Sequence, residues 1–273
     1  MRHLAGPFLA LVMVLALPVP AGAWVQSQSS KGAKLSWSDS CLTMYINERG
    51  SDDVADDSEL AEIEASFDTW GAVSCSSFLI QFAGLTNLEV TGHLKEDPSV
   101  NMVLFREKKW PYSTRPVAFT AVTYNVNTGE IYDADIEMNG EDYSFTTKPD
   151  KETWKIDIQN TITHELGHVL GIDHTPNVEA TMFDHAGPGE INKRTLEQDD
   201  IDAVCTLYPL VENMMCTKVD PLYLFYDFPE ARGEESCTAG RGGSGPAGLA
   251  LLGLALLTLM VLRRRSCALL RQG

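Results

Sequence analysis

Residues 164–174 read His-Glu-Leu-Gly-His-Val-Leu-Gly-Ile-Asp-His. Residues four apart share a face of an α-helix, so His164 and His168 can direct their imidazoles at the same metal ion. We expect Gly171 to end that helix, because glycine adopts a left-handed backbone conformation at little cost, and the turn to bring up His174 as a third ligand. Three protein ligands leave a fourth position for water, which is typical of a catalytic rather than a structural zinc site.

Glu165 directly follows the first histidine, on a neighbouring face of the expected helix. Its carboxylate can reach a water molecule on the metal without binding the metal, so we expect Glu165 to act as the general base. A His-Glu-x-x-His string alone arises by chance in helices, where each histidine is an ordinary surface or packed residue. The third histidine, three residues past a glycine, favours the zinc site over that alternative.

Met182 lies eight residues after the last histidine, in the string Ala180-Thr181-Met182. Methionine also serves as generic core filler, but this placement resembles the methionine-containing turn below the metal in the metzincin clan of zinc endopeptidases. Within that clan the chain is most similar to the matrixins. Two further stretches carry the resemblance: Gly-x-Ile-x-Asp-Ala-Asp-Ile at 129–136 and Leu-Glu-Gln-Asp-Asp-Ile-Asp-Ala-Val-Cys-Thr-Leu-Tyr at 196–208. The resemblance extends over roughly residues 35–209.

Runs typical of strands surround two segments with helical periodicity. The expected strands are residues 41–46, 78–82, 100–105, 117–124 and 130–138. An acidic stretch at 51–59, suited to a helix N-terminus, precedes apolar residues at helical spacing. These are Leu60, Ile63, Phe67 and Trp70. A last helix is expected from about residue 195 to residue 207.

The zinc helix is expected to be long and to begin at Pro149-Asp150. Its buried side would comprise Trp154, Ile158, Ile162, Leu166 and Val169. The matrixin resemblance implies an α+β fold, with a twisted, mixed, five-stranded sheet. It also implies an active-site helix, a second long helix and a C-terminal helix.

The N-terminal end reads as a targeting segment. Residues 1–23 contain Arg2 and His3, an apolar run and a final Ala21-Gly22-Ala23. This pattern predicts a secretory signal peptide, and the apolar run is too short for the alternative of a membrane anchor. The mature chain is then expected to start at Trp24, with a catalytic domain over residues 24–210.

The C-terminal end has a different pattern. Residues 211–236 read as an acidic linker and residues 237–273 as a tail, in which Cys237 precedes a glycine- and serine-rich stretch, an apolar run and three arginines. The tail resembles the myxobacterial C-terminal sorting signal, which implies processing near Cys237 and retention at the cell surface or release. The alternative is a plain C-terminal membrane anchor. Either way we expect an exported protein, at the cell surface (outer membrane) or extracellular, whose only membrane contact is through the tail.

The charge of the expected mature segment is strongly negative. All 38 acidic residues, but only 15 of the 21 basic ones, lie between residues 24 and 236, which leaves a formal charge of −23. Such a surface argues against binding to nucleic acid or to anionic membranes. It favours cationic substrates or calcium, or it is simply a soluble acidic surface of a secreted protein.

Six cysteines in an exported chain indicate disulfides. Two of them belong to the tail, and the other four allow three pairings. The four are Cys41, Cys75, Cys205 and Cys216. We expect Cys41–Cys75 and Cys205–Cys216, which would join neighbouring elements.

Asp133, Asp135 and Glu137 alternate along an expected strand and so share one face. Their oxygens are suitable ligands for calcium; the alternative is a polar strand face in contact with water. Vertebrate-type matrixins carry a structural zinc with extra histidines in this region. Because only His93 and His185 are to spare, we expect no second zinc, and we place His185 at a pocket rim or on the surface.

The region after the zinc motif contains one match to the matrixins and one departure from them. Asp199 and Asp200 match an aspartate pair that in the matrixins anchors the active-site base and the mature N-terminus. Phe183-Asp184-His185 replaces the usual tyrosine-proline of the family. The pocket for the residue after the scissile bond is therefore left undefined by the resemblance.

These residues together predict a secreted or cell-surface zinc endopeptidase, acting as a monomer on protein or peptide substrates. An extended peptide is expected to lie antiparallel to the edge strand near residues 118–123, held by backbone hydrogen bonds. One alternative is a non-catalytic zinc-bearing protein for binding or adhesion, which would have no use for Glu165. Another is a calcium-dependent structural protein, for which an open three-histidine site is a poor choice.

Overall fold

The computed structural model describes residues 24–93, 100–113, 115–212, 214 and 216–217. These all belong to the first of two units into which the chain divides, Met1–Tyr226 and Asp227–Gly273. The expected signal peptide, most of the linker and the tail with Cys237 lie outside the described residues. None of the helices in the described ranges combines the length and apolar character needed to cross a bilayer.

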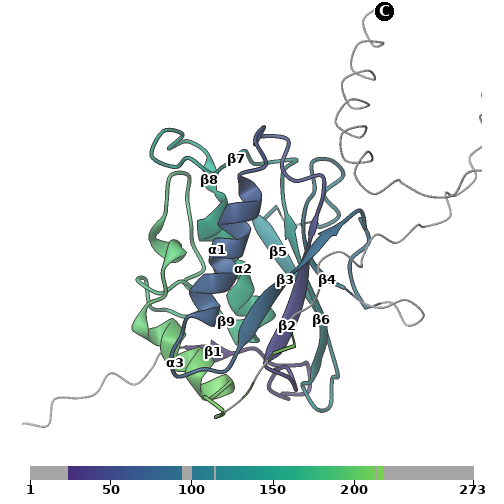
Figure 1. Ribbon diagram of the computed structural model, residues 1–273, viewed down its shortest axis with the longest axis vertical. Coiled ribbons are helices and arrows are strands. Elements are labelled where there is room, and N and C mark those ends of the chain that lie inside the picture. The colour runs from purple at the N-terminus through teal and green to yellow at the C-terminus, as the bar shows by residue number, and fades with distance from the viewer. Residues whose placement is uncertain (1–23, 94–99, 114, 213, 215, 218–273) are drawn as a thin grey trace, which may run out of the picture. The chain divides into compact units, whose positions relative to one another are not determined.

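A mixed five-stranded sheet forms one layer of the fold (Figure 1). In spatial order its strands are β3 (Leu79–Thr86), β2 (Cys41–Asn47), β4 (Asn101–Phe105), β6 (Ile131–Met138) and β5 (Ala118–Tyr124). The first four strands run parallel to one another. Strand β5 runs antiparallel to its neighbour β6 and forms one edge of the sheet. The expectation of an α+β fold with a mixed five-stranded sheet is confirmed.

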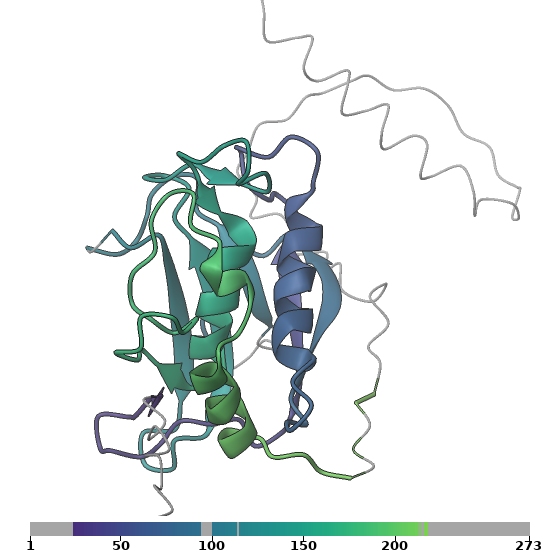
Figure 2. The same ribbon diagram turned by 90° about the vertical axis from the view of Figure 1, so that its left-hand side faces the viewer.

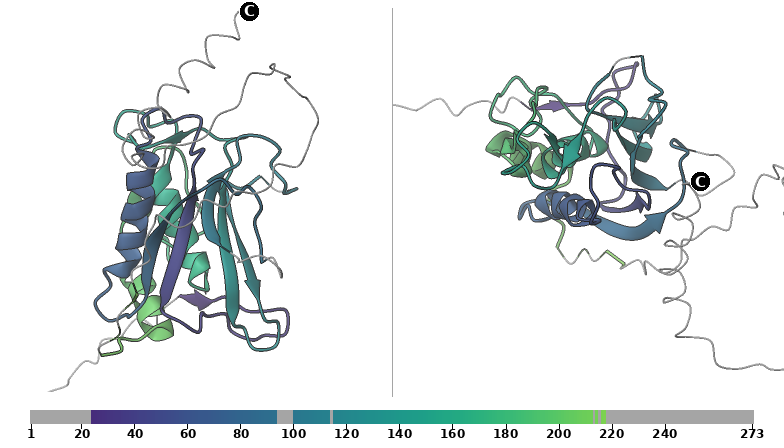
Figure 3. Two further views of the ribbon diagram at one scale, coloured as in Figure 1. Left: turned by 45° about the vertical axis from the view of Figure 1, so that its right-hand side comes forward. Right: turned by 90° about the horizontal axis from the view of Figure 1, so that it is seen from above.

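Two helices, α1 (Glu59–Gly71) and α2 (Ile158–Val169), lie side by side on one face of the sheet (Figures 2 and 3). The main core lies between these layers, with Ile63 and Trp70 from α1 and Leu166 from α2 almost inaccessible to water. Each such side chain stabilises the fold by about 1.5–3 kcal/mol on burial. The indole N–H of Trp70 donates to the Thr163 carbonyl at 2.9 Å, which ties α1 to the zinc helix.

The remaining elements are short and lie around the ends of α2. They are β1 (Val25–Gln26), β7 (Phe145–Thr146), β8 (Ile156–Asp157), β9 (Ile172–Asp173), the 3₁₀ turn η1 (Asn192–Arg194) and α3 (Gln198–Leu207). Strand β1 pairs with β9, just after the zinc helix, and β7 pairs with β8, just before it. The helix is thus held at both ends by short strand pairs.

The predicted start of the zinc helix was wrong by about two turns. Residues before Ile156 form turns, and Trp154 is 68% exposed rather than buried. Asp157 is the true N-cap, because its Oδ1 accepts the Asn160 N–H at 2.8 Å while its own backbone is extended. The Arg194 guanidinium holds the same carboxylate through Nε at 2.7 Å and Nη2 at 2.5 Å, which fixes the cap from outside the helix.

The expected disulfide pairing was also wrong, since the structure joins Cys41 to Cys216 and Cys75 to Cys205, with Cα separations of 5.5 and 5.4 Å. The reason is the packing of the chain that follows α3. The Leu210 N–H donates to the Cys75 carbonyl at 3.0 Å, so the end of α3 and the residues after it lie against the turn after α1. Cys205 is therefore beside Cys75 rather than beside Cys216. Closeness in sequence therefore did not correspond to closeness in space.

Candidate metal centre and cleft

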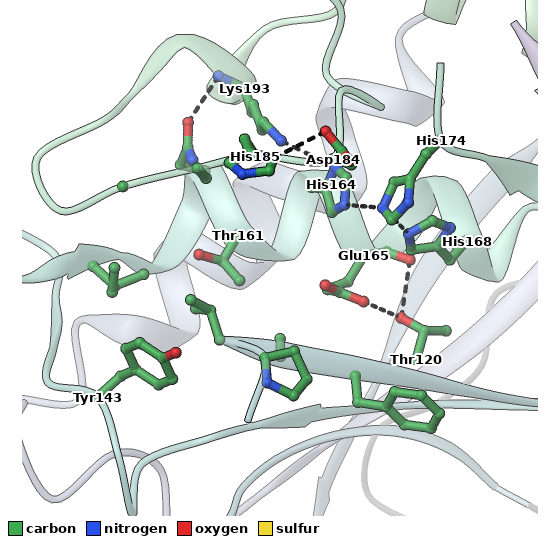
Figure 4. Close-up of a pocket in the computed structure, with 18 of the residues that line it drawn as sticks. Thr120, Tyr143, Thr161, His164, Glu165, His168, His174, Asp184, His185 and Lys193 are labelled. Carbon is green, nitrogen blue, oxygen red and sulfur yellow. Dashed lines mark hydrogen bonds and ion pairs between the residues drawn. The ribbon is translucent and has the colours of Figure 1, made fainter. Parts of the chain in front are cut away.

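The three predicted zinc ligands converge at the end of α2 (Figure 4). His164 and His168 extend from the same face of the helix, and His174 Nε2 lies 3.2 Å from the Nε2 atom of each. Gly171 makes the turn with φ +83°, and a β-carbon there would lie 2.6 Å from the Leu35 carbonyl oxygen. Glycine is required at this position for both reasons.

Backbone carbonyls fix the tautomer of two of the imidazoles. His164 donates from Nδ1 to the Thr181 carbonyl at 2.6 Å, and His168 donates from Nδ1 to the Ile172 carbonyl at 2.9 Å. Each Nε2 therefore presents a lone pair to the centre. Burial also lowers the pKa of His164 well below its usual value and lowers that of His174, which favours neutral rings.

This donor set fits a zinc ion. Among the described residues, the three histidines are the one group of three or more His, Cys, Asp or Glu whose ligand atoms all lie within 4.8 Å of one another. Neutral imidazoles with hydrogen-bonded Nδ1 atoms are the usual ligands of an open zinc site.

The turn containing Met182 packs under the zinc helix. Met182 is buried, and its side chain occupies the space that a β-carbon on Gly167 would need. Asp200 of α3 holds this turn, because its carboxylate accepts the N–H of Thr181 at 2.8 Å and that of Met182 at 3.1 Å. Since the Thr181 carbonyl orients His164, Asp200 supports a zinc ligand through the turn. Sequence reasoning missed Gly167 and Thr181, although both lie within the quoted motifs.

Asp199, the neighbour of Asp200, contacts the start of the described chain. Its Oδ1 accepts the Trp24 backbone N–H at 2.9 Å, and its Oδ2 accepts the Thr175 hydroxyl at 2.8 Å. Trp24 is the expected first residue of the mature chain. The geometry thus brings that residue to the helix beside the metal-binding turn.

Glu165 lies on the wall of a cleft with a volume of about 550 Å³ that also includes the three histidines. Its Oε2 accepts a hydrogen bond of 2.6 Å from the Thr120 hydroxyl on edge strand β5. This bond aims the carboxylate away from the helix and into the cleft (Figure 4). Thr120 lies in the expected edge strand, but its contact with Glu165 could not be predicted, because that contact depends on the sheet edge lying over α2.

Further cleft residues come from the segment after Met182, among them His185 and Lys193. His185 is exposed at the rim and contacts the Asp184 carboxylate at 3.0 Å. Lys193 is only 4% exposed, and burial lowers the pKa of its ammonium group. Lys193 donates to the Phe183 carbonyl, and no sequence pattern singled it out.

Asp133, Asp135 and Glu137, the three acidic residues proposed for calcium, are buried on the face of the sheet that points away from α1 and α2. The alternative of a polar strand face in contact with water was therefore wrong. Glu137 binds Arg106 at 2.5 Å and accepts the Tyr112 hydroxyl at 2.6 Å. Asp135 accepts two backbone N–H groups, while the oxygens of Asp133 receive no hydrogen bond from a described donor. Burial raises the pKa of both aspartates, that of Asp135 to about 8. Calcium binding stays a prediction.

His93 lies near this acidic face, its ring centroid 6.0 Å from that of Tyr132. The expectation of a single zinc is not tested by this placement.

A mixed sheet, a helix that presents two histidines, a third histidine after the glycine turn and a methionine-containing turn beneath them together define the metzincin class of zinc peptidases. The family model for matrixin, peptidase M10, matches residues 36–209, and the chain belongs to that family. Rat stromelysin-1 is 37% identical over 65 residues, which is 22% of this chain and 14% of the relative. Metalloendoproteinase 1 of Glycine max is 38% identical over 56 residues, which is 20% of this chain and 18% of the relative. The matched segments thus span less than a fifth of either relative.

Proposed function

We propose that this protein is a secreted or cell-surface zinc endopeptidase that hydrolyses peptide bonds within proteins. The observation that carries the proposal is the pairing of three converging Nε2 atoms with a carboxylate, Glu165, aimed into the same cleft. A binding or structural zinc site would need the histidines but not the carboxylate. Membership of the matrixin family supports the same activity.

A zinc ion held by His164, His168 and His174 would polarise the scissile carbonyl and make a water molecule more acidic. Glu165 takes the proton of the attacking water and then transfers it to the leaving amine. The Thr120 hydroxyl holds one carboxylate oxygen at 2.6 Å, which leaves the other free for this transfer. The carbonyls bound to the histidine Nδ1 atoms keep the rings in place throughout.

Strand β5 supplies the surface for the substrate backbone. It pairs with β6 on one side, and within the described sheet no strand pairs with its other side. The residues of β5 from Ala118 to Thr120 line the cleft. An extended peptide added antiparallel to β5 would place a peptide bond beside Glu165 and bind through main-chain groups common to all sequences.

The test compares digestion of casein by the mature protein and by Glu165→Gln. We expect the wild type alone to cut, with zinc content and thermal unfolding unchanged in the variant. Glu179→Gln is the matched control, because it makes the same chemical change at an exposed glutamate outside the cleft. Equal cutting by Glu165→Gln and wild type would refute the role of Glu165, whereas no cutting by a zinc-loaded, folded wild type would favour the binding-protein alternative.

We also propose that the chain is exported, processed after residue 23 and sorted through its tail. Two disulfides support an oxidising compartment, because such bonds are rare in the cytosol. Mass spectrometry of the protein from its native cells tests this. A mature N-terminus at Trp24 and a C-terminus near Cys237 are expected, and recovery of the whole chain from the cytoplasm would contradict the proposal.

A further inference from the structure

Lys193 is a buried cation at the wall of the cleft. Its backbone N–H donates to Asn160 Oδ1 at 2.7 Å, so the residue is fixed one helical turn before His164. In the described part of the chain, no carboxylate lies within 4.0 Å of its ammonium nitrogen. Carboxylates farther away, those of Glu190, Glu165, Asp184 and Asp200, favour the charged form, but none of them forms an ion pair with it. A carboxylate bound in the cleft beside the ammonium group would therefore stabilise this buried charge further.

The hydrogen bonds of Lys193 leave part of its ammonium group unused. One N–H donates to the Phe183 carbonyl. His164 Nδ1 lies 3.4 Å away, but it cannot accept, because it already donates its own proton to the Thr181 carbonyl. The group has three N–H donors, so two remain for an acceptor in the cleft.

The direction of β5 shows which part of a bound peptide would meet Lys193. The Tyr143 hydroxyl donates to the Arg115 carbonyl at 2.8 Å, just before β5 begins. Figure 4 shows Tyr143 and Thr161 at one end of the cleft, and Thr120 and His168 at the other. Strand β5 therefore runs from the Thr161 end toward the His168 end.

A peptide antiparallel to β5 runs the opposite way, with its C-terminal half toward Thr161. Asn160 adjoins Thr161 on the helix and holds the backbone N–H of Lys193, while the ammonium nitrogen lies 3.4 Å from His164 Nδ1. In Figure 4 the Lys193 side chain lies on the Thr161 side of His168 and His174. The first side chain after the scissile bond is the one that reaches this part of the cleft.

We propose that Lys193 selects substrates with an acidic residue, glutamate or aspartate, immediately after the scissile bond. The inference rests on the proposed peptidase function and names a preference within it. A carboxylate at that position accepts the two free N–H groups of Lys193 and neutralises the buried charge. These N–H groups lie in a site shielded from water. A hydrogen bond made there discriminates strongly against substrate side chains that have no acceptor atom.

The test uses four fluorogenic peptides that differ only in the residue after the scissile bond: glutamate, glutamine, leucine or lysine. For the wild type we expect kcat/KM for the glutamate peptide to exceed that for the glutamine peptide at least about tenfold, as for other shielded charge pairs. In Lys193→Met we expect that ratio to approach one. Lys108→Met, which removes the same charge from an exposed lysine outside the cleft, should keep the wild-type ratio.

The outcomes are separable. If the wild type cuts these peptides without preferring glutamate, the inference is wrong even if Lys193→Met fails to fold. If Lys193→Met lowers kcat/KM for all four peptides by the same factor, Lys193 only supports the loop through the Phe183 carbonyl, and the inference is again wrong. If the wild type cuts neither these peptides nor casein, the proposed function itself fails.

Discussion

Replacing Asp200 by alanine is expected to lower both stability and zinc affinity, because one carboxylate accepts three backbone N–H groups. Two of the donors, on Thr181 and Met182, belong to residues that are almost inaccessible to water. The third is the N–H of Glu197 at 2.9 Å, part of the reciprocal cap at the start of α3. Leaving a buried donor unsatisfied costs about 1–3 kcal/mol, and loss of a cap about 1 kcal/mol. The free energy of unfolding should therefore fall by about 3–7 kcal/mol.

Urea unfolding in the presence of a chelator measures this change without a contribution from bound metal. Asp200→Asn keeps one carbonyl oxygen and should lose less than the alanine variant. Asp202→Ala, at an exposed position on the same helix, is the control and should change stability by less than about 1 kcal/mol. If Asp200→Ala is no less stable than Asp202→Ala, or binds zinc as tightly as the wild type, the coupling from α3 through the turn to His164 is refuted.

Three further changes are predicted. The pKa of Asp135 in the folded chain is raised above its unfolded value to about 8, so between these two values the folded state binds one proton that the unfolded state does not. Without metal, the free energy of unfolding should therefore fall as the pH rises from about 4 to about 8. Urea titrations over this range measure the slope, which Asp135→Asn should flatten. Removing the bridge with Cys75→Ala and Cys205→Ala should lower the free energy of unfolding by about 4–5 kcal/mol, since it closes a 130-residue separation; an unchanged urea midpoint would contradict this. A chain that begins at Trp24 should be more stable than one with extra residues before it, because a free ammonium pairs more strongly with Asp199 than an amide does; calorimetry of both forms, with and without Asp199→Asn, checks this.

The convergence of the three histidines could be predicted from the sequence because it depends on local geometry. The spacing of His164 and His168 and the glycine at 171 set three ligands within eleven consecutive residues, and little else is needed to bring them together. The helical spacing of Ile63 and Trp70 likewise predicted the buried face of α1. These signals depend on neighbours in sequence rather than on packing.

The failures all depend on contacts between distant segments. Asp157 caps the zinc helix with help from Arg194, so periodicity alone extended the helix too far. Cys205 pairs with Cys75 because α3 packs near the turn after α1. Lys193 reaches the cleft from a turn that no local motif marks, and the contact of Thr120 with Glu165 depends on the packing of the expected edge strand over α2.

Because Asp200 belongs to the last helix, the geometry around His164 depends on a segment that is synthesised well after the zinc motif itself. Cys205, on the same helix, is joined to Cys75, and Cys216 just beyond it is joined to Cys41. A nascent chain that ends before α3 therefore contains every zinc ligand but lacks Asp200, which holds the turn that orients one of them. The orientation of this zinc ligand in this way depends on completion of the chain as far as its last helix.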